Sequence, residues 1–373
     1  MVLSVSLRNA AYSKNYSTYI REDTPTNTVH VFAPDYFSRF RCKCGDCRSV
    51  CCHGWRITLS RAEYFRLLGI ECSPELRRRI DTAFYISENP TEEEYAYISP
   101  SADGNCHMLD DDGWCMLHRE CGEGVQPAVC RLYPRAIRPG DPAEAVCSGS
   151  CEKTIEMLME EPYPLPFTVT ELQTKSAPPA GADPERFDLR RRCVEAWQAE
   201  GDTRDRFRGL AELLGVADDG FSVHSVSELL TYAQDLLEFF ARGDITLCDI
   251  TEEALERFSM TDGVTQESVT VFTRAEARLK TVLPDLEKYY GNIMANHMFY
   301  AAFPYAADGI GYSDAYRGLA AVYVILRFLC TCAAFGENVR DRFADIAATA
   351  MRYMEHTDFY AISRTVHAAL GRR

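Results

Sequence analysis

The feature that most constrains the fold of this chain is the high density of cysteines in its first half. The stretch 40–55 reads FRCKCGDCRSVCCHGW and contains Cys42, Cys44, Cys47, Cys51 and Cys52. A second cysteine-rich stretch runs from residue 106 to residue 151, and one further cysteine lies between the two, so that 12 of the 16 cysteines fall within 110 residues. Any fold for this part of the chain must be built around these thiols.

Closely spaced thiols in a reducing compartment favour a metal site over disulfides. The N-terminus lacks the apolar core and cleavage site of a secretory signal, so we expect a cytoplasmic protein with reduced thiols. Thiolates at such spacings converge on a soft cation, which offsets the cost of their charge. A four-cysteine zinc site and a four-cysteine iron–sulfur cluster both satisfy the spacing, and one or two metals are both compatible with it.

The other potential ligands and cofactor motifs are less informative. Isolated cysteines are usually small buried apolar residues, and we expect this of Cys72, Cys193, Cys248, Cys330 and Cys332. The C-x₃-C-x₂-C signature of radical adenosylmethionine enzymes is absent, because the cysteines at 44, 47 and 51 have the reverse spacing. The histidines at 53, 107 and 118 lie beside cysteines, where a hydrogen-bonded supporting role is favoured over metal ligation.

The pattern along the chain predicts a mostly α fold with two parts. Short elements around the cysteines indicate an N-terminal metal-binding domain over 31–160, after a poorly ordered extension over 1–30. Prolines and small residues over 161–183 predict a linker, and an α-helical domain follows over 184–373. Cap residues and apolar periodicity predict helices over 60–68, from 73, over 152–160, 203–214, 227–242, from 251, and over 271–280, 285–302, 314–335, 338–354 and 360–369.

Charge and hydropathy restrict the partners. The net charge of −15 argues against nucleic acid, because phosphate binding needs a basic face. It suits a basic, lysine-bearing partner or a solvated acidic surface. The apolar run 318–336 is long enough to span a membrane, but Arg327 lies at its middle, where a charge costs about 2.5–3.5 kcal/mol. We therefore expect a buried core helix and no membrane association.

Several of these motifs together resemble a known family. The pattern C-x₄-C-x₃-C-C-x-G-W ends at Gly54-Trp55, and C-x-x-L-D begins at residue 106 and includes Asp110. The pattern C-R-x-Y-P-R covers 130–135, and Cys151-Glu152 follows. These segments, with 286–305 and 352–360 in the helical half, resemble the flagellin lysine-N-methylases, which lie within the wider group of proteins with a zinc- or iron-chelating domain of the CxxCxxCC type.

The chain also departs from the family pattern. It has an N-terminal extension and additional cysteines at 44, 121 and 147, and it lacks the proline that usually separates the last cysteine from its glutamate. The additional thiols leave open which four surround a given metal.

The resemblance implies an enzyme that transfers a methyl group from S-adenosylmethionine to lysine side chains of flagellin, with an iron–sulfur cluster of the 4Fe–4S type. Eight cysteines match the family pattern and are implied as metal ligands: Cys42, Cys47, Cys51, Cys52, Cys106, Cys115, Cys130 and Cys151. Only a neutral lysine amine is a nucleophile, and its ordinary pKa is ~10.4. The site therefore needs a base, for which Asp110, His118 and Tyr133 are candidates.

The remaining implied contacts involve aromatic and basic residues near the cysteines. Trp55 and Trp114 are the aromatic side chains closest in sequence to the metal motifs and suit the positively charged sulfonium of the cofactor. Trp55, Asp110, Tyr133 and Arg135 are the expected substrate- and cofactor-binding residues. The alternative is a non-enzymatic zinc- or iron-binding scaffold or metal-handling protein, and a third, weaker hypothesis is a redox protein whose cluster only carries electrons.

Overall fold

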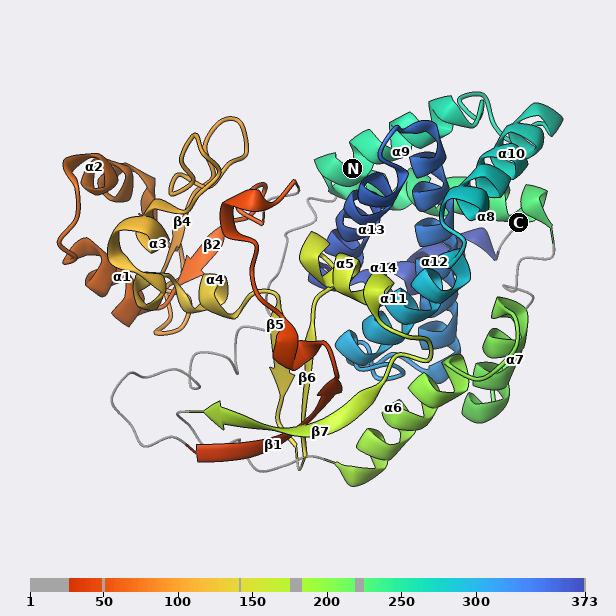
Figure 1. Ribbon diagram of the computed structural model, residues 1–373, viewed down its shortest axis with the longest axis horizontal. Helices are drawn as coiled ribbons and strands as arrows, with labels where there is room; N and C mark the ends of the chain where they lie inside the picture. The colour runs from red at the N-terminus through yellow and green to blue at the C-terminus, as the bar shows by residue number, and fades with distance from the viewer. Residues whose placement is uncertain (1–26, 49–50, 141, 175–182, 219–224, 372–373) are drawn as a thin grey trace.

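The computed structural model describes residues 27–48, 51–140, 142–174, 183–218 and 225–371. Within these ranges the chain forms fourteen α-helices and seven β-strands (Figure 1). The mostly α prediction is confirmed. Residues 1–26, most of the predicted N-terminal extension, lie outside the described part, whereas residues 27–30 belong to a strand.

A small lobe, residues 57–132, surrounds its own hydrophobic core and lies apart from the main body of helices (Figure 1, left). Its three-stranded sheet has the order β2-β4-β3. Ten buried apolar residues form the core, among them Leu59, Ile80 and Met116. The elements are β2 (Ile57–Leu59), α1 (Arg61–Leu68), α2 (Pro74–Ala83), β3 (Phe84–Ile86), β4 (Ala96–Ile98), α3 (Met116–Cys121) and α4 (Ala128–Leu132).

Helix caps in the small lobe are those that the sequence predicts. The Ser60 side chain accepts a hydrogen bond from the backbone of Glu63, whose carboxylate accepts from the Ser60 backbone in return. Ser73 caps α2 in the same way, and Pro74 occupies the first helical position, where no N–H is needed. Each cap satisfies backbone donors that the first helical turn leaves unpaired, which fixes where both helices begin.

A four-stranded mixed sheet joins the cysteine-rich half to the helices. Its order is β5-β6-β1-β7, with β1 and β6 parallel and the other pairs antiparallel. The strands are β1 (Asn27–Pro34), β5 (Arg135–Arg138), β6 (Ala143–Cys147) and β7 (Phe167–Thr174). β1 pairs with β7 along its whole length, from Asn27 opposite Thr174 to Pro34 opposite Phe167.

The strand β7 lies inside the segment 161–183 that the sequence analysis assigns to a linker, so this part of the segment is a strand and not a linker. Three prolines at 162, 164 and 166 produce the linker pattern, but the strand begins directly after the last of them. There Thr168, Val169 and Thr170 favour extended backbone. Residues 175–182 lie outside the described part of the chain.

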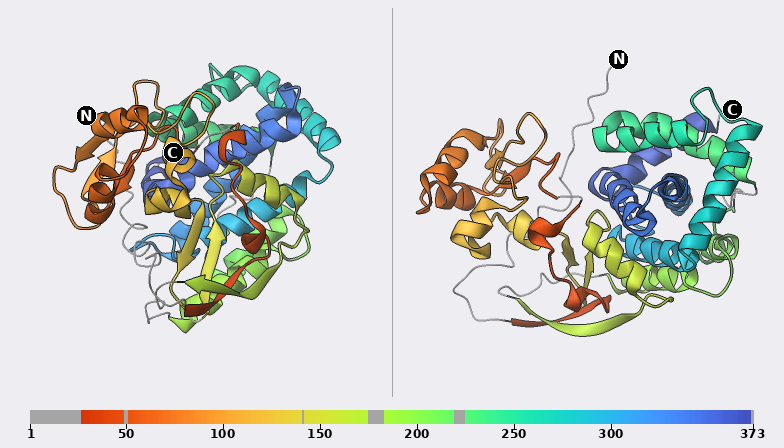
Figure 2. Two further views of the ribbon diagram at one scale, coloured as in Figure 1. Left: turned by 60° about the vertical axis from the view of Figure 1, so that its left-hand side comes forward. Right: turned by 45° about the horizontal axis from the view of Figure 1, so that its top comes forward.

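The large lobe consists of this sheet and the helices α5 to α14. The right view of Figure 2 shows helices arranged around one seen end-on. The bounds are α5 (Glu152–Glu160), α6 (Pro184–Trp197), α7 (Thr203–Leu214), α8 (Val226–Phe240), α9 (Ile245–Arg257), α10 (Gln266–Val282), α11 (Leu286–Tyr300), α12 (Tyr312–Thr331), α13 (Val339–His356) and α14 (Phe359–Leu370). Short 3₁₀ turns are η2 (Phe37–Arg39), η3 (Cys44–Asp46), η4 (Glu123–Val125), η5 (Ala241–Gly243) and η6 (Cys332–Phe335).

The start of α9 differs from its predicted position. The helix begins at Ile245 and not at Thr251, because the Asp244 side chain accepts a hydrogen bond from the backbone of Leu247 at 2.9 Å and caps the helix there. Thr251 lies in the interior of α9, where its hydroxyl donates to the carbonyl of Leu247 at 2.6 Å.

Helix α12 is the centre of the large lobe. It packs against α8, α13 and α14, and nearly all of its side chains are buried. With the following turn it forms the one helix in the described ranges that is long and apolar enough to span a membrane, and 89% of its most apolar 18-residue window is buried. Arg327 is paired with Glu276 of α10 at 2.7 Å. The prediction of a buried core helix is confirmed.

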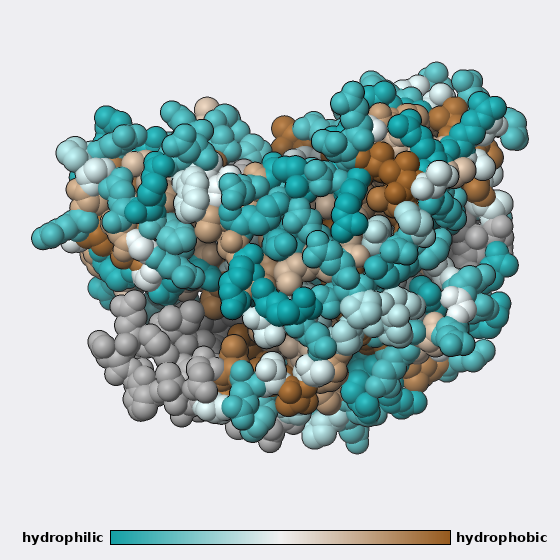
Figure 3. All heavy atoms as spheres, in the orientation of Figure 1, coloured by the Kyte–Doolittle hydropathy of each residue, from teal (hydrophilic) through white to brown (hydrophobic). Residues whose placement is uncertain are grey.

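The sheet and α5 share the hydrophobic core of the helices. Val31 of β1, Ala145 of β6 and Leu158 of α5 belong to the same cluster of buried residues as α11 and α12. The amide of Asn296 on α11 also donates to the carbonyl of Cys147 at 3.0 Å. The division between the two cores therefore does not coincide with the predicted boundary at residue 160. The face shown in Figure 3 is mainly hydrophilic, with small apolar patches.

Candidate functional site

The first cysteine segment is fixed to the N-terminal end of α5. Cys151 is the N-cap residue of this helix. The Lys43 ammonium binds the carboxylates of Glu152 at 2.5 Å and Glu156 at 3.0 Å, and the backbone N–H of Arg48 donates to Glu152 at 3.1 Å. These contacts place residues 43–48 next to Cys151, although the two segments are about a hundred residues apart in sequence.

The second cysteine stretch begins with a tight hairpin in the small lobe. The backbone N–H of Cys106 donates to the carbonyl of Cys52 at 2.6 Å, and Cys115 forms a bridge with Leu109. One oxygen of Asp110 accepts hydrogen bonds from the backbone of residues 112 and 114 at 3.0 and 2.8 Å, and the other is paired with Arg119. Asp110, a candidate base, therefore shapes the turn between these cysteines.

The hairpin also contacts the first cysteine segment. A Cβ atom on Gly45 would lie 2.3 Å from the indole nitrogen of Trp114, so only glycine fits beneath this ring. Trp114 and the nearby His118 therefore serve this packing in the described structure. Arg135 donates to the carbonyl of Phe40 at 3.2 Å and stacks over its ring, which supports the chain just before the first cysteine.

The cysteine thiols lie close enough to affect one another. Burial raises the pKa of Cys47 to about 12, and the neighbouring carboxylate of Glu152 and thiol of Cys151 act in the same direction. Burial also raises the pKa of Cys130 well above its ordinary value, and Cys106 contributes. A bound cation would offset the free-energy cost of forming these buried thiolates, because its positive charge favours the deprotonated form.

The donor set fits a soft metal or an iron–sulfur cluster. Sγ of Cys42 accepts a backbone N–H from Cys44 at 3.3 Å. Backbone N–H groups of Met108 and Leu109 also bond to Cys106, and they lower its pKa against the effect of burial. Such donors stabilise thiolate ligands. Within the described ranges, no three histidine, cysteine or acidic side chains already converge as a metal-binding group.

A cavity of about 200 Å³ lies between the first cysteine segment and α13, and we call it the Cys51 cavity. Its walls bring together three of the predicted site residues: Cys51, Trp55 and Tyr133. Asp110, His118 and Arg135 are not among its lining residues. The full lining is Arg48, Cys51, His53, Trp55, Tyr133, Ser150, Thr246, Ala348, Thr349 and Arg352.

A chain of hydrogen bonds leads from the wall of the Cys51 cavity into the large lobe. The Tyr133 hydroxyl is 2.9 Å from Oγ of Ser150, which is 2.9 Å from Nε2 of His356. Ser150 is also 2.6 Å from Ser148, whose hydroxyl donates to the carboxylate of Glu355 at 2.6 Å. The chain links a cavity residue to a fully buried acidic side chain.

Glu355 lies at the buried end of this network. Its carboxylate also accepts the backbone N–H of Gly149 at 2.7 Å and lies 3.1 Å from Nδ1 of His297. The other nitrogen of that imidazole is 3.1 Å from the hydroxyl of Tyr360. The side chains of His297 and Glu355 are completely inaccessible to solvent. Buried polar networks of this kind rigidify a site when every member has a partner.

Burial sets the protonation of the two groups nearest the cavity. It lowers the pKa of His356 to about 4, so that the imidazole is neutral at neutral pH. It raises the pKa of Tyr133 well above 10, so that the phenol keeps its proton. The site therefore presents a neutral base beside a protonated hydroxyl, which is a combination suited to proton transfer.

Arg352 supplies a cation at the cavity wall. Its guanidinium lies 4.0 Å from the centre of the Trp55 ring and donates to the carbonyl of His53. Burial lowers the pKa of Arg352. The edge of the Trp55 ring contacts His356, with centroids 4.8 Å apart. Because Arg352 stacks on Trp55, this ring is a poorer partner for a positively charged sulfonium than the sequence suggests.

Sequence reasoning missed His297, Arg352, Glu355 and His356 as members of the site. The signal was present, because all four lie in the two helical segments that carry the family resemblance. The sequence does not show that these segments pair with residues 133–150, which lie more than 130 positions earlier in the chain.

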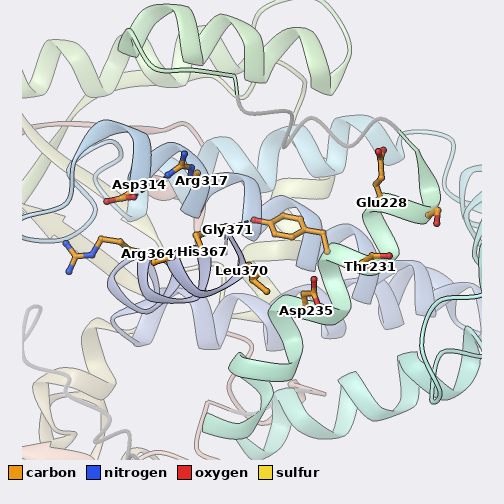
Figure 4. Close-up of a pocket in the computed structure, with 12 residues that line it drawn as sticks. Glu228, Thr231, Asp235, Asp314, Arg317, Arg364, His367, Leu370 and Gly371 are labelled. Atoms are coloured by element: carbon orange, nitrogen blue, oxygen red, sulfur yellow. Dashed lines mark hydrogen bonds and ion pairs between the residues drawn. The ribbon is translucent and has the colours of Figure 1, made fainter. Parts of the chain in front are cut away.

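A larger cavity of about 780 Å³ lies elsewhere, between α8, α12 and α14 (Figure 4). Side chains of both charges line it, including Glu228, Asp235 and Arg364. None of the predicted site residues is among its lining. Size alone would select this cavity, but the convergence of thiols, aromatic rings and a neutral imidazole favours the Cys51 cavity.

Comparison with known proteins supports the resemblance. The chain is 30% identical to the lysine-N-methylase of Salmonella typhimurium over 108 residues. This aligned stretch covers 29% of this chain and 27% of the relative. It is 29% identical over the same length to the lysine-N-methylase of Salmonella choleraesuis, again covering 27% of the relative. It is 28% identical over 108 residues to the flagellar biosynthetic protein FliU of Salmonella muenchen, covering 63% of that protein.

The match therefore spans about a quarter of each lysine-N-methylase. No family model matches the chain, and no solved structure matches it. The predicted resemblance to lysine-N-methylases is confirmed over a stretch of 108 residues.

Proposed function

We propose that the chain is a cytoplasmic protein-lysine N-methyltransferase, which transfers a methyl group from S-adenosylmethionine to lysine side chains of flagellin and depends on a cysteine-ligated iron–sulfur cluster. The similarity to two lysine-N-methylases carries this proposal. The name of the third relative, a flagellar biosynthetic protein, favours flagellin as the substrate. The Cys51 cavity supplies groups suited to the reaction.

The eight cysteines of the family pattern would hold the metal. They are Cys42, Cys47, Cys51, Cys52, Cys106, Cys115, Cys130 and Cys151. When bound, an iron–sulfur cluster supplies one-electron chemistry, and the protein adjusts its potential through hydrogen bonds to sulfur. The backbone N–H groups directed at Cys42 and Cys106 are donors of this type.

The cavity residues would prepare the lysine for transfer. In the transfer step the amine nitrogen forms a bond to the methyl carbon while the carbon–sulfur bond breaks, and its electron pair remains on sulfur. The nitrogen must also lose a proton. Neutral His356 accepts that proton through the hydroxyl of Ser150, which bonds to both His356 and Tyr133. The Tyr133 phenol stays protonated and orients this hydroxyl.

The positive side chains on the cavity wall suit the carboxylate of the cofactor. Arg352 has no carboxylate within ion-pair distance in the described part of the chain, whereas Arg48 is paired with Asp345 and Glu156. Guanidinium–carboxylate pairs are strong and directional. The net charge of −15 complements a lysine-bearing protein.

Calorimetry with S-adenosylmethionine tests cofactor binding by the anaerobically purified, metal-loaded protein. We expect binding by the wild type and at least about tenfold weaker binding by Arg352→Ala, since a charge-assisted pair contributes about 1.5–3 kcal/mol. Arg340→Ala is the matched control, because Arg340 lies on the same helix and its guanidinium bonds to Tyr289. Absence of binding with metal present would overturn the proposal in favour of a non-enzymatic metal-binding module.

A further inference from the structure

Three of the eight cysteines of the family pattern pack against hydrophobic cores, and they are divided between the two cores. Cys106 and Cys115 pack against the core of the small lobe. Cys151 packs against the core of the large lobe. Because each core is a separate cluster of buried side chains, these thiols are anchored to different bodies of the protein.

Four of the cysteines are attached to the small lobe by backbone contacts or by their position in it, and we call them the small-lobe set. The backbone contact between Cys52 and Cys106 brings the first cysteine stretch to the hairpin, and the hairpin brings Cys115 back beside it. Cys130 lies on α4, which is fixed to α1 because the backbone N–H of Ala128 donates to Glu63 at 2.6 Å. The set consists of Cys52, Cys106, Cys115 and Cys130, and all four are half-buried.

The other four gather at the start of α5, and we call them the cavity set: Cys42, Cys47, Cys51 and Cys151. The contacts of Lys43 and Arg48 with Glu152 hold this part of the chain against the helix that Cys151 caps. Two members of the set, Cys42 and Cys51, are exposed, and Cys51 lines the Cys51 cavity. This set therefore includes exposed thiols and borders the cavity, whereas the small-lobe set contains no exposed thiol.

The adjacent pair Cys51-Cys52 lies at the junction between the sets. Cys52 is tied by its backbone to Cys106 in the small lobe, while Cys51 contributes to the cavity wall with Tyr133 and Ser150. Adjacent cysteines with these neighbours can belong to two different metal sites, with each thiol acting as a ligand in one of them.

We propose that the chain has two separate four-thiolate metal sites: a closed structural site formed by the small-lobe set, and an open site formed by the cavity set. This inference rests on the metal-binding part of the proposed function. Closed sites with four protein ligands are typical of structural metals, whereas sites that take part in chemistry are open to a substrate.

We expect the structural metal to stabilise the small lobe, because this lobe has only a small hydrophobic core. Its core contains ten buried apolar residues, and its single sheet and its helices are short. Small domains with so little buried apolar surface are commonly stabilised by a metal or by disulfides. The cavity set has no such role, because α5 and its neighbours are already part of the large core.

Cobalt titration of the reduced, metal-free, full-length protein under anaerobic conditions tests the inference. The readouts are thiolate-to-cobalt absorption and the metal retained per chain after gel filtration. We expect two cobalt ions in the wild type, one in Cys115→Ser, one in Cys47→Ser and none in the double variant. Cys121→Ser and Cys44→Ser are matched controls from the same segments and should retain two.

Limited proteolysis separates the roles of the two sites. We expect Cys115→Ser to expose cleavage sites in the small lobe and Cys47→Ser to leave that lobe protected. If Cys115→Ser does not fold, Cys47→Ser alone still tests the inference through its single remaining ion. A wild type with one metal, or loss of all metal in Cys47→Ser, would overturn it by showing a single shared site.

These outcomes are distinguishable from failure of the proposed function. A protein that binds two metals but neither binds S-adenosylmethionine nor transfers methyl groups supports the two sites and removes the enzymatic role. A protein that transfers methyl groups with one metal per chain supports the enzymatic role and overturns the two sites.

Discussion

Replacing Glu355 should destabilise the protein strongly, because this buried carboxylate is the centre of the network behind the Cys51 cavity. It accepts hydrogen bonds from Ser148 at 2.6 Å and Gly149 at 2.7 Å, and lies 3.1 Å from His297. In Glu355→Ala the backbone N–H of Gly149 and Nδ1 of His297 lose this partner in a site closed to solvent, whereas the Ser148 hydroxyl keeps its bond to Ser150. A buried donor without a partner costs about 1–3 kcal/mol.

We therefore expect the free energy of unfolding to fall by about 2–5 kcal/mol in Glu355→Ala, because two buried groups lose a partner. Glu355→Gln keeps one acceptor oxygen and the side-chain volume, so its loss should be about 1–2 kcal/mol. Urea unfolding followed by far-ultraviolet circular dichroism measures both. Glu238→Ala is the matched control, because Glu238 is an exposed glutamate within a helix, paired only with Arg242.

The control should change the free energy of unfolding by no more than about 0.5 kcal/mol. If Glu355→Ala were as mild as this control, the network would not stabilise the fold, and the site would have to be accessible to water that replaces the lost partner.

Three further predictions concern packing, pH dependence and catalysis. Gly45→Val should collide with Trp114 and destabilise the protein by about 1–3 kcal/mol in thermal unfolding, whereas Gly209→Ala, with no atom within 4 Å, should stabilise it by about 0.5–1 kcal/mol; equal effects would refute the close approach. Burial lowers the pKa of His356 to about 4, so the unfolded state binds the proton more readily than the folded state. The contribution of neutral His356 to the free energy of unfolding is therefore complete above pH 6.5 and is lost as the pH falls towards 4. Wild type should therefore lose about 1–3 kcal/mol more between pH 7 and pH 4 than His356→Gln, and parallel urea-denaturation profiles would contradict this. Tyr133→Phe should slow methyl transfer about tenfold or more at pH 7 without loss of metal, and an unchanged rate would exclude Tyr133 from the reaction.

The sequence predicts those parts of the fold that local chemistry determines. The helices at 61–68 and 203–214 follow from their cap residues, because a cap satisfies backbone groups within three residues of itself. The burial of α12 follows from its apolar composition and the charge of Arg327. The metal site that the cysteine spacing predicts stays a prediction.

Features that depend on distant contacts are not predictable in this way. The strand β7 forms because it pairs with β1, more than 130 residues earlier in the chain. The contact between Ser148 and Glu355 spans 207 positions, and neither residue belongs to a short motif with a known role. The turn contacts of Asp110 are local in sequence, whereas its role as a base, predicted from its position near the cysteines, stays a prediction.

The most direct test of the account is transfer of an isotopically labelled methyl group from S-adenosylmethionine to flagellin by the anaerobically purified protein, with modified residues identified by mass spectrometry. We predict labelled methyl groups on lysine side chains, loss of labelling after removal of the metal or in Cys47→Ser, and full labelling with Cys248→Ser, whose thiol lies on α9 in the large lobe. Absence of labelled lysine with a metal-loaded, folded protein would contradict the account.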